Sequence, residues 1–436
     1  MISAPLTVSL EITDKCNYRC PHCYRLDNND GLIPRTVFKE KDEIVFEIAK
    51  KLVDARIFSI ILTGGEPLLN KTLTAKLVEY FKSSNICVSL NTNLVLLDDA
   101  FLKEIMNIKL DSILVSCPAS NPEIYRRMTG NGDFSKFEVT LKKIVASGMH
   151  CIVNMVVNKI NLRFVRETAT KMANIGVKKF GVTPMALNVL HPEENLFLDK
   201  NEVVWLINDL LWIKKSLGIS VDILEALPKC IFPEKIRESG LNFLQRKCQA
   251  GITTMAVSDN GDVRPCTHNP DVYGNLFKEP LSSIWEKMSG WRSGLYIPGE
   301  CKNCKVLNKC LGGCRMTARA FSGKEQGKDP WMTELLLEDN FKQWPVVFSL
   351  DKDSIIYFAE SFKWRREGDD YLICTKTPNN ILRVNDELFR LVNYLWKTGK
   401  IRLNDLAVMN NLLFDDVNFQ KIIKLLLRKK FIFSTR

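Results

Sequence analysis

Three cysteines near the amino terminus constrain this 436-residue chain more than any other feature. Cys16, Cys20 and Cys23 form a C-x3-C-x2-C pattern directly after the apolar, strand-like run 6–12. Three thiolates at this spacing can hold a cluster of four irons and leave one iron open to another ligand. A zinc knuckle or three buried thiols are the alternatives that the triad alone leaves open. The pattern predicts an iron–sulfur site at the end of a strand.

A second motif, Gly64-Gly65-Glu66-Pro67, follows the strand-like run 58–62, and His22 places an aromatic ring just before the third cysteine. Together with the triad, these residues resemble the radical S-adenosylmethionine enzymes. The resemblance implies that the cofactor's methionine group chelates the open iron and that its cleavage yields a 5′-deoxyadenosyl radical. It also implies cofactor binding by His22 through its backbone, by the glycine pair through close approach, and by Glu66 as an acceptor.

Later positions match that family less completely. Asn93 lies in an Asn-Thr-Asn turn with Leu94 where the family usually has glycine, and Ser116 begins a run that lacks the usual aspartate and glycine. The resemblance still implies cofactor contacts for Asn93 and Ser116. It implies a pairing of Arg127 with the cofactor carboxylate, with Arg126 as its rival.

Short β-branched runs alternate with helical patterns from residue 6 to about 185, which predicts an α/β fold. The six predicted strands span residues 6–12, 58–62, 86–91, 112–116, 151–157 and 179–183. The resemblance implies a partial (β/α)6 TIM barrel, whereas alternation alone also permits an open doubly wound sheet. The motif residues all follow strands, where ligands bind in either architecture.

A second cysteine set begins at Cys248 and resembles the twin-cluster extension called SPASM, found in radical enzymes that modify peptides. The match covers Cys248, Gly261, Cys266, Cys301, Cys304, Cys310 and Cys314. Taken alone, the four cysteines from 301 to 314 would also suit a zinc ribbon. The resemblance implies one auxiliary 4Fe-4S cluster on Cys248, Cys266 and Cys314. It implies a second on Cys301, Cys304 and Cys310.

Met332 stands where the family carries its last cysteine. The second auxiliary cluster therefore uses Asp329, uses Cys374, or is absent, so one or two auxiliary clusters are expected. An extra cysteine that some relatives carry is replaced by Thr254, which leaves the first cluster without a predicted fourth ligand. We interpret the remaining cysteines as packing residues: Cys87, Cys117, Cys151, Cys230 and Cys374.

The carboxyl-terminal region is cysteine-poor, with predicted strands at 346–350, 354–359 and 370–375 and helices at 386–397, 403–410 and 416–429. This order predicts a small winged-helix-like α+β domain. It resembles the PqqD-like RiPP recognition element that grips leader peptides, with Leu382–Asn385 opening the first helix. Winged helices also bind DNA, which is the alternative for this region.

The composition bounds the rest of the prediction. The formal charge of +11 can steer an acidic partner, but no arginine-rich tract appears, so nucleic acid is not expected as a partner. No apolar run has membrane-spanning length, and cysteines in metal-ligand spacings favour a cytoplasmic location. We predict a barrel core with a bridging helix at 1–235, a SPASM domain at 236–344 whose metal replaces a missing apolar core, and a peptide-recognition domain at 345–436.

These features together predict a radical SAM/SPASM peptide maturase. It would abstract hydrogen from a ribosomally made precursor peptide, leader plus core, and install a thioether, carbon–carbon or ether crosslink, or epimerise a residue. A flavodoxin- or ferredoxin-type protein would supply electrons. The alternatives are a sulfatase-maturase-like or small-molecule cofactor-synthesis radical SAM enzyme, and a cluster-containing winged-helix transcription regulator.

Overall fold

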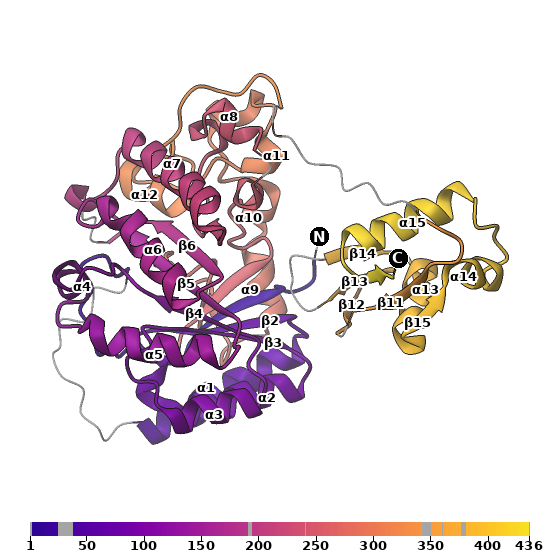
Figure 1. The fold of residues 1–436 in the computed structure, drawn as a ribbon, viewed down its shortest axis with the longest axis horizontal. Helices are drawn as coiled ribbons and strands as arrows, with labels where there is room; N and C mark the ends of the chain where they lie inside the picture. Colours follow the sequence, from indigo (N-terminus) through magenta and orange to yellow (C-terminus); the bar gives the residue numbers. More distant parts are fainter. Residues whose placement is uncertain are drawn as a thin grey trace. The chain divides into compact units, whose positions relative to one another are not determined.

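The computed structural model describes residues 2–24, 38–190, 194–239, 241–339, 341, 350–359, 361–375 and 381–435. The chain divides into two compact units, Ser3–Lys342 and Gln343–Arg436. Each unit has its own sheets and its own helices (Figure 1). No helix in the described part of the chain is long and apolar enough to cross a membrane.

The first unit is built on one ten-stranded sheet in the order β10-β9-β8-β1-β2-β3-β4-β5-β6-β7. The strands are β1 (Thr7–Glu11), β2 (Ser59–Thr63), β3 (Cys87–Thr92), β4 (Ser112–Ser116), β5 (Cys151–Val157), β6 (Lys179–Pro184), β7 (Ser220–Ile223), β8 (Thr254–Val257), β9 (Asp262–Arg264) and β10 (Gly274–Asn275). Neighbours from β1 to β7 pair in parallel. The first six strands match the predicted ones to within one residue at each end, so the α/β prediction is confirmed.

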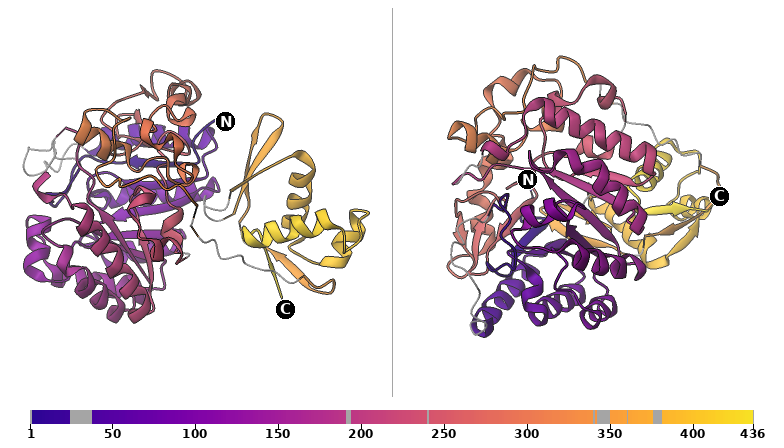
Figure 2. Two further views of the ribbon diagram at one scale, coloured as in Figure 1. Left: turned by 90° about the horizontal axis from the view of Figure 1, so that it is seen from above. Right: turned by 60° about the vertical axis from the view of Figure 1, so that its left-hand side comes forward.

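Seven helices cross between these strands: α1 (Phe38–Asp54), α2 (Lys71–Ser83), α3 (Asp99–Asn107), α4 (Pro122–Thr129), α5 (Phe134–Ala146), α6 (Val165–Ile175) and α7 (Lys200–Leu217). Side chains at their amino termini accept from free backbone N–H groups, as Asn70 does for α2 and Asp98 for α3. Asp199 and Glu202 form a capping box on α7. The helices can be followed by colour from indigo to magenta in Figures 1 and 2.

The sheet continues past the six predicted strands into the cysteine-rich region. β8 pairs in parallel with β1, and β9 and β10 follow antiparallel. Short helices complete this part: α8 (Glu234–Arg237), α9 (Leu281–Lys287), α10 (Ser289–Ser293), α11 (Leu307–Cys310) and α12 (Arg315–Ser322). Single 3-10 turns are η1 (Pro67–Asn70), η2 (Leu162–Phe164), η3 (Glu194–Leu196), η4 (Lys229–Ile231), η5 (Asn242–Gln245) and η6 (Gly299–Asn303).

The expectation that this region lacks an apolar core is wrong. Ile284, Trp285 and Met288 are all fully buried. The apolar contribution was underestimated because β8 joins the barrel sheet directly, so the region shares a core with the barrel and does not need to build one alone.

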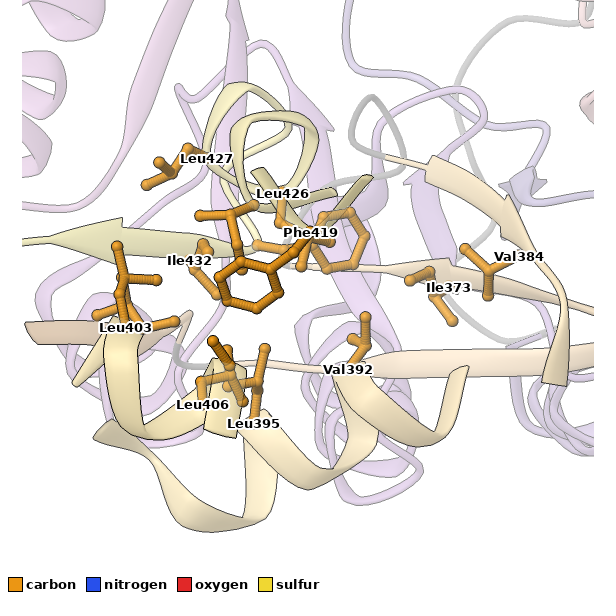
Figure 3. Close-up of a cluster of buried hydrophobic side chains, with 14 of the residues drawn as sticks. Ile373, Val384, Val392, Leu395, Leu403, Leu406, Phe419, Leu426, Leu427 and Ile432 are labelled. Carbon is orange, nitrogen blue, oxygen red and sulfur yellow. The ribbon is translucent and has the colours of Figure 1, made fainter. Parts of the chain in front are cut away.

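The second unit combines two three-stranded sheets with three helices. One sheet has the order β15-β11-β16 and the other β12-β13-β14. The elements are β11 (Ile355–Phe358), β12 (Lys363–Glu367), β13 (Asp370–Cys374), β14 (Ile381–Val384), α13 (Asp386–Thr398), β15 (Lys400–Arg402), α14 (Leu403–Met409), α15 (Val417–Arg428) and β16 (Ile432–Ser434). Both sheets and all three helices contribute to one core, which includes Ile373, Val392 and Phe419 (Figure 3).

The predicted helices of this unit are confirmed within two residues, and two predicted strands correspond to β11 and β13. The strand predicted at 346–350 lies outside the described residues except for Leu350. The segment Leu382–Asn385 does not open a helix as predicted: its first three residues end β14, and Asn385 caps α13 by accepting from the Leu388 N–H. The sequence analysis missed β12, β14, β15 and β16, because strands of three to five residues give almost no periodic signal.

Candidate cofactor and cluster sites

The amino-terminal cysteines lie on the loop that leaves the carboxyl end of β1. Two backbone bonds hold the start of this loop against the next motif: Gly65 N–H donates to Thr13 O at 2.8 Å, and Glu66 N–H donates to Lys15 O at 2.7 Å. Further along, Arg19 N–H donates to Thr129 O at 2.9 Å. The loop is therefore fixed by backbone contacts to two other segments of the barrel.

The thiols of the triad lie in an environment that disfavours isolated thiolates. Cys16 is exposed at the residue level and Cys20 and Cys23 are half-buried. Burial of the Cys16 thiol raises its pKa to about 11, with Glu66 and Cys23 adding to the increase. Burial and the two other thiols raise the pKa of Cys20 further. A cationic cluster supplies the charge that such thiolates need, and its binding would release protons.

The glycine pair of the second motif is required by the cysteine loop itself. A Cβ atom on Gly65 would lie 1.9 Å from Lys15 O, and one on Gly64 would lie 2.3 Å from Thr13 O. Gly64 also has φ +131°, a conformation that other residues rarely adopt. The sequence analysis assigned these glycines to close approach of the cofactor. The contacts show in addition that they let two backbone segments meet.

Glu66 joins this motif to β3. The carboxylate is almost completely buried and accepts from Leu68 N–H (2.9 Å), Thr92 Oγ1 (2.6 Å) and Asn93 N–H (2.7 Å). Burial raises the pKa of Glu66, and these hydrogen bonds oppose the increase. A carboxylate has about four acceptor positions, so one stays available to a ligand. Pro67 is buried and begins η1, where its missing N–H costs nothing.

The Asn93 side chain reaches back to the cysteine loop, because its Nδ2 donates to Asn17 Oδ1 at 2.7 Å. Leu94 occupies the place of the family's glycine and keeps a left-handed backbone, with φ 72°. A left-handed leucine costs about 1–2 kcal/mol. Its side chain is fully buried, and this burial offsets the cost.

The remaining predicted cofactor residues are placed at the same edge with fewer contacts. Ser116 ends β4 with an exposed side chain. Arg126 and Arg127 are both exposed on α4. Exposure therefore does not distinguish which of the two would pair with the cofactor carboxylate. Burial lowers the pKa of His22 to about 4, and its Nδ1 has no hydrogen-bond partner within the described ranges. Exposed polar side chains and a buried nitrogen without a hydrogen-bond partner are typical of a ligand-binding site.

The cysteine-rich hairpin is attached to the amino-terminal loop by two side-chain contacts. The buried carboxylate of Glu11, at the end of β1, pairs with Arg264 at the end of β9. Arg264 also donates to the carbonyl oxygens of Thr267 and Asn269, just after Cys266. Tyr24 stacks on His268 with ring centroids 4.7 Å apart. The loop after Cys266 is therefore held beside the amino-terminal triad.

The first predicted auxiliary set is brought together from three separate segments. The thiol of Cys248 interacts electrostatically with those of Cys266 and Cys314, and burial raises the pKa of each of the three, that of Cys266 to about 12. Glu225 follows β7, and its charge raises the pKa values of all three thiols. The sequence analysis did not single out Glu225, because no local pattern connects it to cysteines 23 or more residues away.

Asp329 contacts Cys314, a member of the first predicted set. Its carboxylate is buried and accepts from Cys314 N–H and Trp331 N–H, each at 2.9 Å. Burial raises the pKa of Asp329 to about 7. These bonds give the carboxylate a structural task, which is to hold the backbone of Cys314.

A cysteine that the sequence analysis assigned to packing, Cys230, lies near the second predicted set, Cys301, Cys304 and Cys310. Burial raises the pKa of Cys301 to about 12, and the thiols of Cys310, Cys230 and Cys304 add to it. Lys229 N–H donates to Cys310 Sγ at 3.2 Å. The Cys230 thiol therefore lies among the thiols of the second set.

The other cysteines lie in strands or directly after one. Cys117, Cys151 and Cys374 are buried, and Cys87 is half-buried. Within the described ranges, no three His, Cys, Asp or Glu side chains converge on the position of a single metal ion.

Comparisons with known proteins identify both parts of the first unit. Residues 10–172 match the model of the radical SAM superfamily, and residues 248–305 match the model of an iron–sulfur cluster-binding domain, SPASM. The chain contains a radical SAM domain followed by a SPASM domain. It is a radical SAM enzyme whose cofactors are S-adenosylmethionine and iron–sulfur clusters, which confirms the recognition and cofactor class predicted from the cysteines.

Relatives with quite different names cover most of the chain. The AdoMet-dependent heme synthase of Methanosarcina barkeri is 22% identical over 76% of this chain and 97% of its own. The mycofactocin maturase MftC of Mycolicibacterium smegmatis is 24% identical over 76% of this chain and 84% of its own. The PqqA peptide cyclase of Gluconobacter oxydans is 23% identical over 82% of this chain and 98% of its own.

Among solved structures, Streptococcus suis SuiB bound to the precursor peptide SuiA superposes with a TM-score of 0.59. The match covers 75% of each chain at 18% identity. This likeness confirms the partial-barrel architecture.

Proposed function

We propose that the chain modifies a ribosomally made precursor peptide by radical chemistry. S-adenosylmethionine bound at a reduced 4Fe-4S cluster supplies a 5′-deoxyadenosyl radical, which takes a hydrogen atom from the substrate. Cys16, Cys20 and Cys23 would hold that cluster. The cofactor would lie against His22, the 64–67 motif, Asn93, Ser116 and Arg127 at the carboxyl edge of the sheet.

The observation that carries the redox part of this proposal is the contact between the two cysteine regions. Glu11 with Arg264, and Tyr24 with His268, hold the Cys266 loop beside the triad loop. A carbon radical formed on the substrate must lose one electron to close a crosslink. A nearby auxiliary cluster on Cys248, Cys266 and Cys314 would accept it, and a flavodoxin- or ferredoxin-type donor would reduce the first cluster. Such thiol-rich sites suit the reducing cytoplasm.

The second unit supports a peptide substrate. Among the described strands, β12 pairs with β13 in the sheet β12-β13-β14. Along β12 the side chains alternate, with Trp364 and Arg366 exposed and Arg365 buried. The buried Arg365 pairs with Glu367 at 2.7 Å and fixes the inward face. We propose that this unit binds an acidic leader by adding it as a strand to one of its sheets. The names of the PqqA peptide cyclase and of the SuiB complex agree with a peptide substrate.

Removal of the second unit tests this proposal. A chain ending at residue 342 should bind the leader of the precursor peptide encoded nearest its gene about a hundredfold more weakly, equivalent to about 2.7 kcal/mol. Fluorescence anisotropy measures the affinity, and S-adenosylmethionine cleavage without peptide, which should survive, is the control. Equal affinity of the shortened and full-length chains would refute leader recognition, as would a preference of residues 343–436 for duplex DNA.

The heme synthase relative favours a second candidate, a radical enzyme of small-molecule cofactor synthesis. In that case the shortened chain would keep its full activity on the small substrate. Mass spectrometry of the precursor peptide after anaerobic turnover separates the two candidates, because only a peptide maturase changes the mass or hydrogen–deuterium content of the core.

A further inference from the structure

Met332 stands in place of the missing family cysteine, and the residue after it is hydrogen-bonded to another cysteine, Cys230. Met332 is buried, and its N–H donates to Asp329 O at 2.9 Å. The next residue, Thr333, donates its N–H to Cys230 Sγ at 3.3 Å and its hydroxyl to Cys230 O at 2.8 Å. The segment that would carry the family's last cysteine therefore ends beside the Cys230 thiol.

The other side of Cys230 faces the second auxiliary set. Cys230 lies in the single turn η4, and the preceding residue, Lys229, donates its N–H to Cys310 Sγ at 3.2 Å. The Cys230 thiol interacts electrostatically with those of Cys301 and Cys310. Lys229 is itself buried and tied to Arg246 O through its Nζ at 2.5 Å, which anchors the turn.

Of the two substitutes suggested by the sequence, Asp329 is hydrogen-bonded to the backbone of the first set, and Cys374 lies in the second unit. Both carboxylate oxygens of Asp329 accept backbone bonds, one of them from Cys314 of the first set. Cys374 belongs to the second unit, where it is buried in β13 and donates to Thr375 O.

We propose that Cys230 is the fourth protein ligand of the second auxiliary cluster, completing Cys301, Cys304 and Cys310 in place of the cysteine absent at Met332. Cys230 would hold the cluster as a thiolate, with its proton released to solvent. A cluster with four cysteine ligands has no open iron, so it would carry electrons and not bind substrate. This inference goes beyond the proposed function and does not depend on which substrate is used.

Iron content of the full-length protein, reconstituted anaerobically without peptide, tests this assignment. The wild-type chain should hold about twelve irons, and Cys230→Ala should either fall to about eight or change the electron paramagnetic resonance signal of one reduced cluster. Cys304→Ala should give the same loss. Cys87→Ala, which removes a half-buried thiol at the start of β3, is the matched control and should leave both readouts unchanged.

A double variant makes the test specific to the exchanged position. Cys230→Ala with Met332→Cys should restore the iron content, because position 332 directly precedes Thr333, whose N–H contacts the Cys230 sulfur. If Cys230→Ala does not fold, Cys230→Ser keeps the shape of the side chain and should shift the Mössbauer parameters of one cluster. A wild-type chain with only about eight irons would overturn the assignment. An unchanged count and spectrum in both Cys230 variants would overturn it as well.

Discussion

The amino-terminal triad and the auxiliary cysteines differ in how much of the chain each site needs. The triad occupies eight residues of one loop, between Cys16 and Cys23. The auxiliary thiols, together with Cys230 beside them, come from segments as far apart as residues 230 and 314 and approach one another only in the folded chain. A site on one loop can be recognised from spacing. A site assembled from distant segments can exchange one ligand for another without leaving a local pattern.

The largest effect is expected at the triad itself. Replacing Cys16, Cys20 and Cys23 together with alanine removes every predicted protein ligand of the open-iron cluster, so cleavage of S-adenosylmethionine to 5′-deoxyadenosine should be abolished. Because the auxiliary thiols belong to other segments, their cluster absorbance should remain. Chromatography of 5′-deoxyadenosine and visible spectra measure the two effects. Continued production of 5′-deoxyadenosine by the triple variant would show that the radical site lies elsewhere.

The next effect tests the contact that joins the two cysteine regions. Arg264→Ala removes the guanidinium that offsets the buried charge of Glu11, and breaking such a pair costs about 3–5 kcal/mol. The Cys266 loop also loses two donors, so we expect weaker binding of the first auxiliary cluster together with a lower unfolding temperature. Arg264→Met with Glu11→Gln leaves no unpaired charge and should recover part of the stability. Unchanged stability and iron content in Arg264→Ala would show that the first auxiliary cluster does not depend on the contact between Glu11 and Arg264.

A smaller effect is expected where the triad loop meets the glycine pair. In Gly65→Ala the new methyl would overlap Lys15 O, and the loop must shift, at a cost of about 2–4 kcal/mol. Gly299→Ala is a matched control, because Gly299, like Gly65, has no left-handed φ, and nothing lies within 4 Å of the added atom. Chemical denaturation and iron content should separate the two. Equal behaviour of the two variants would mean that the loop does not depend on this close approach.

The smallest effect concerns the charge beside the first auxiliary set. Glu225→Gln removes a negative charge that acts on Cys248, Cys266 and Cys314, so the reduction potential of that cluster should rise by on the order of 50 mV. A redox titration followed by electron paramagnetic resonance measures the shift, and the triad cluster is the internal reference. A potential unchanged within error would place the Glu225 charge too far from the cluster to matter.

Local sequence predicted the barrel and the class of its cofactors. The parallel strands are short β-branched runs that alternate with helical patterns, and this alternation is visible without tertiary information. Each of these two motifs, the triad and the 64–67 motif, lies within a few consecutive residues. Their chemistry could therefore be inferred from residue order alone. The short strands of the second unit were missed for the opposite reason, because β12, β14, β15 and β16 are stabilised by pairing and not by their own pattern.

The sequence by itself determined that this chain is a radical SAM enzyme with a SPASM extension, since thiol spacing and strand-end glycines are local properties. Only the tertiary structure decided which distant side chains surround each auxiliary set. It placed Cys230 with Cys301 and Cys310, Glu225 beside the first set, and Asp329 on the backbone of Cys314. The physical reason is that thiols and carboxylates act over a few ångströms, and chain folding brings residues within that range irrespective of their separation in sequence.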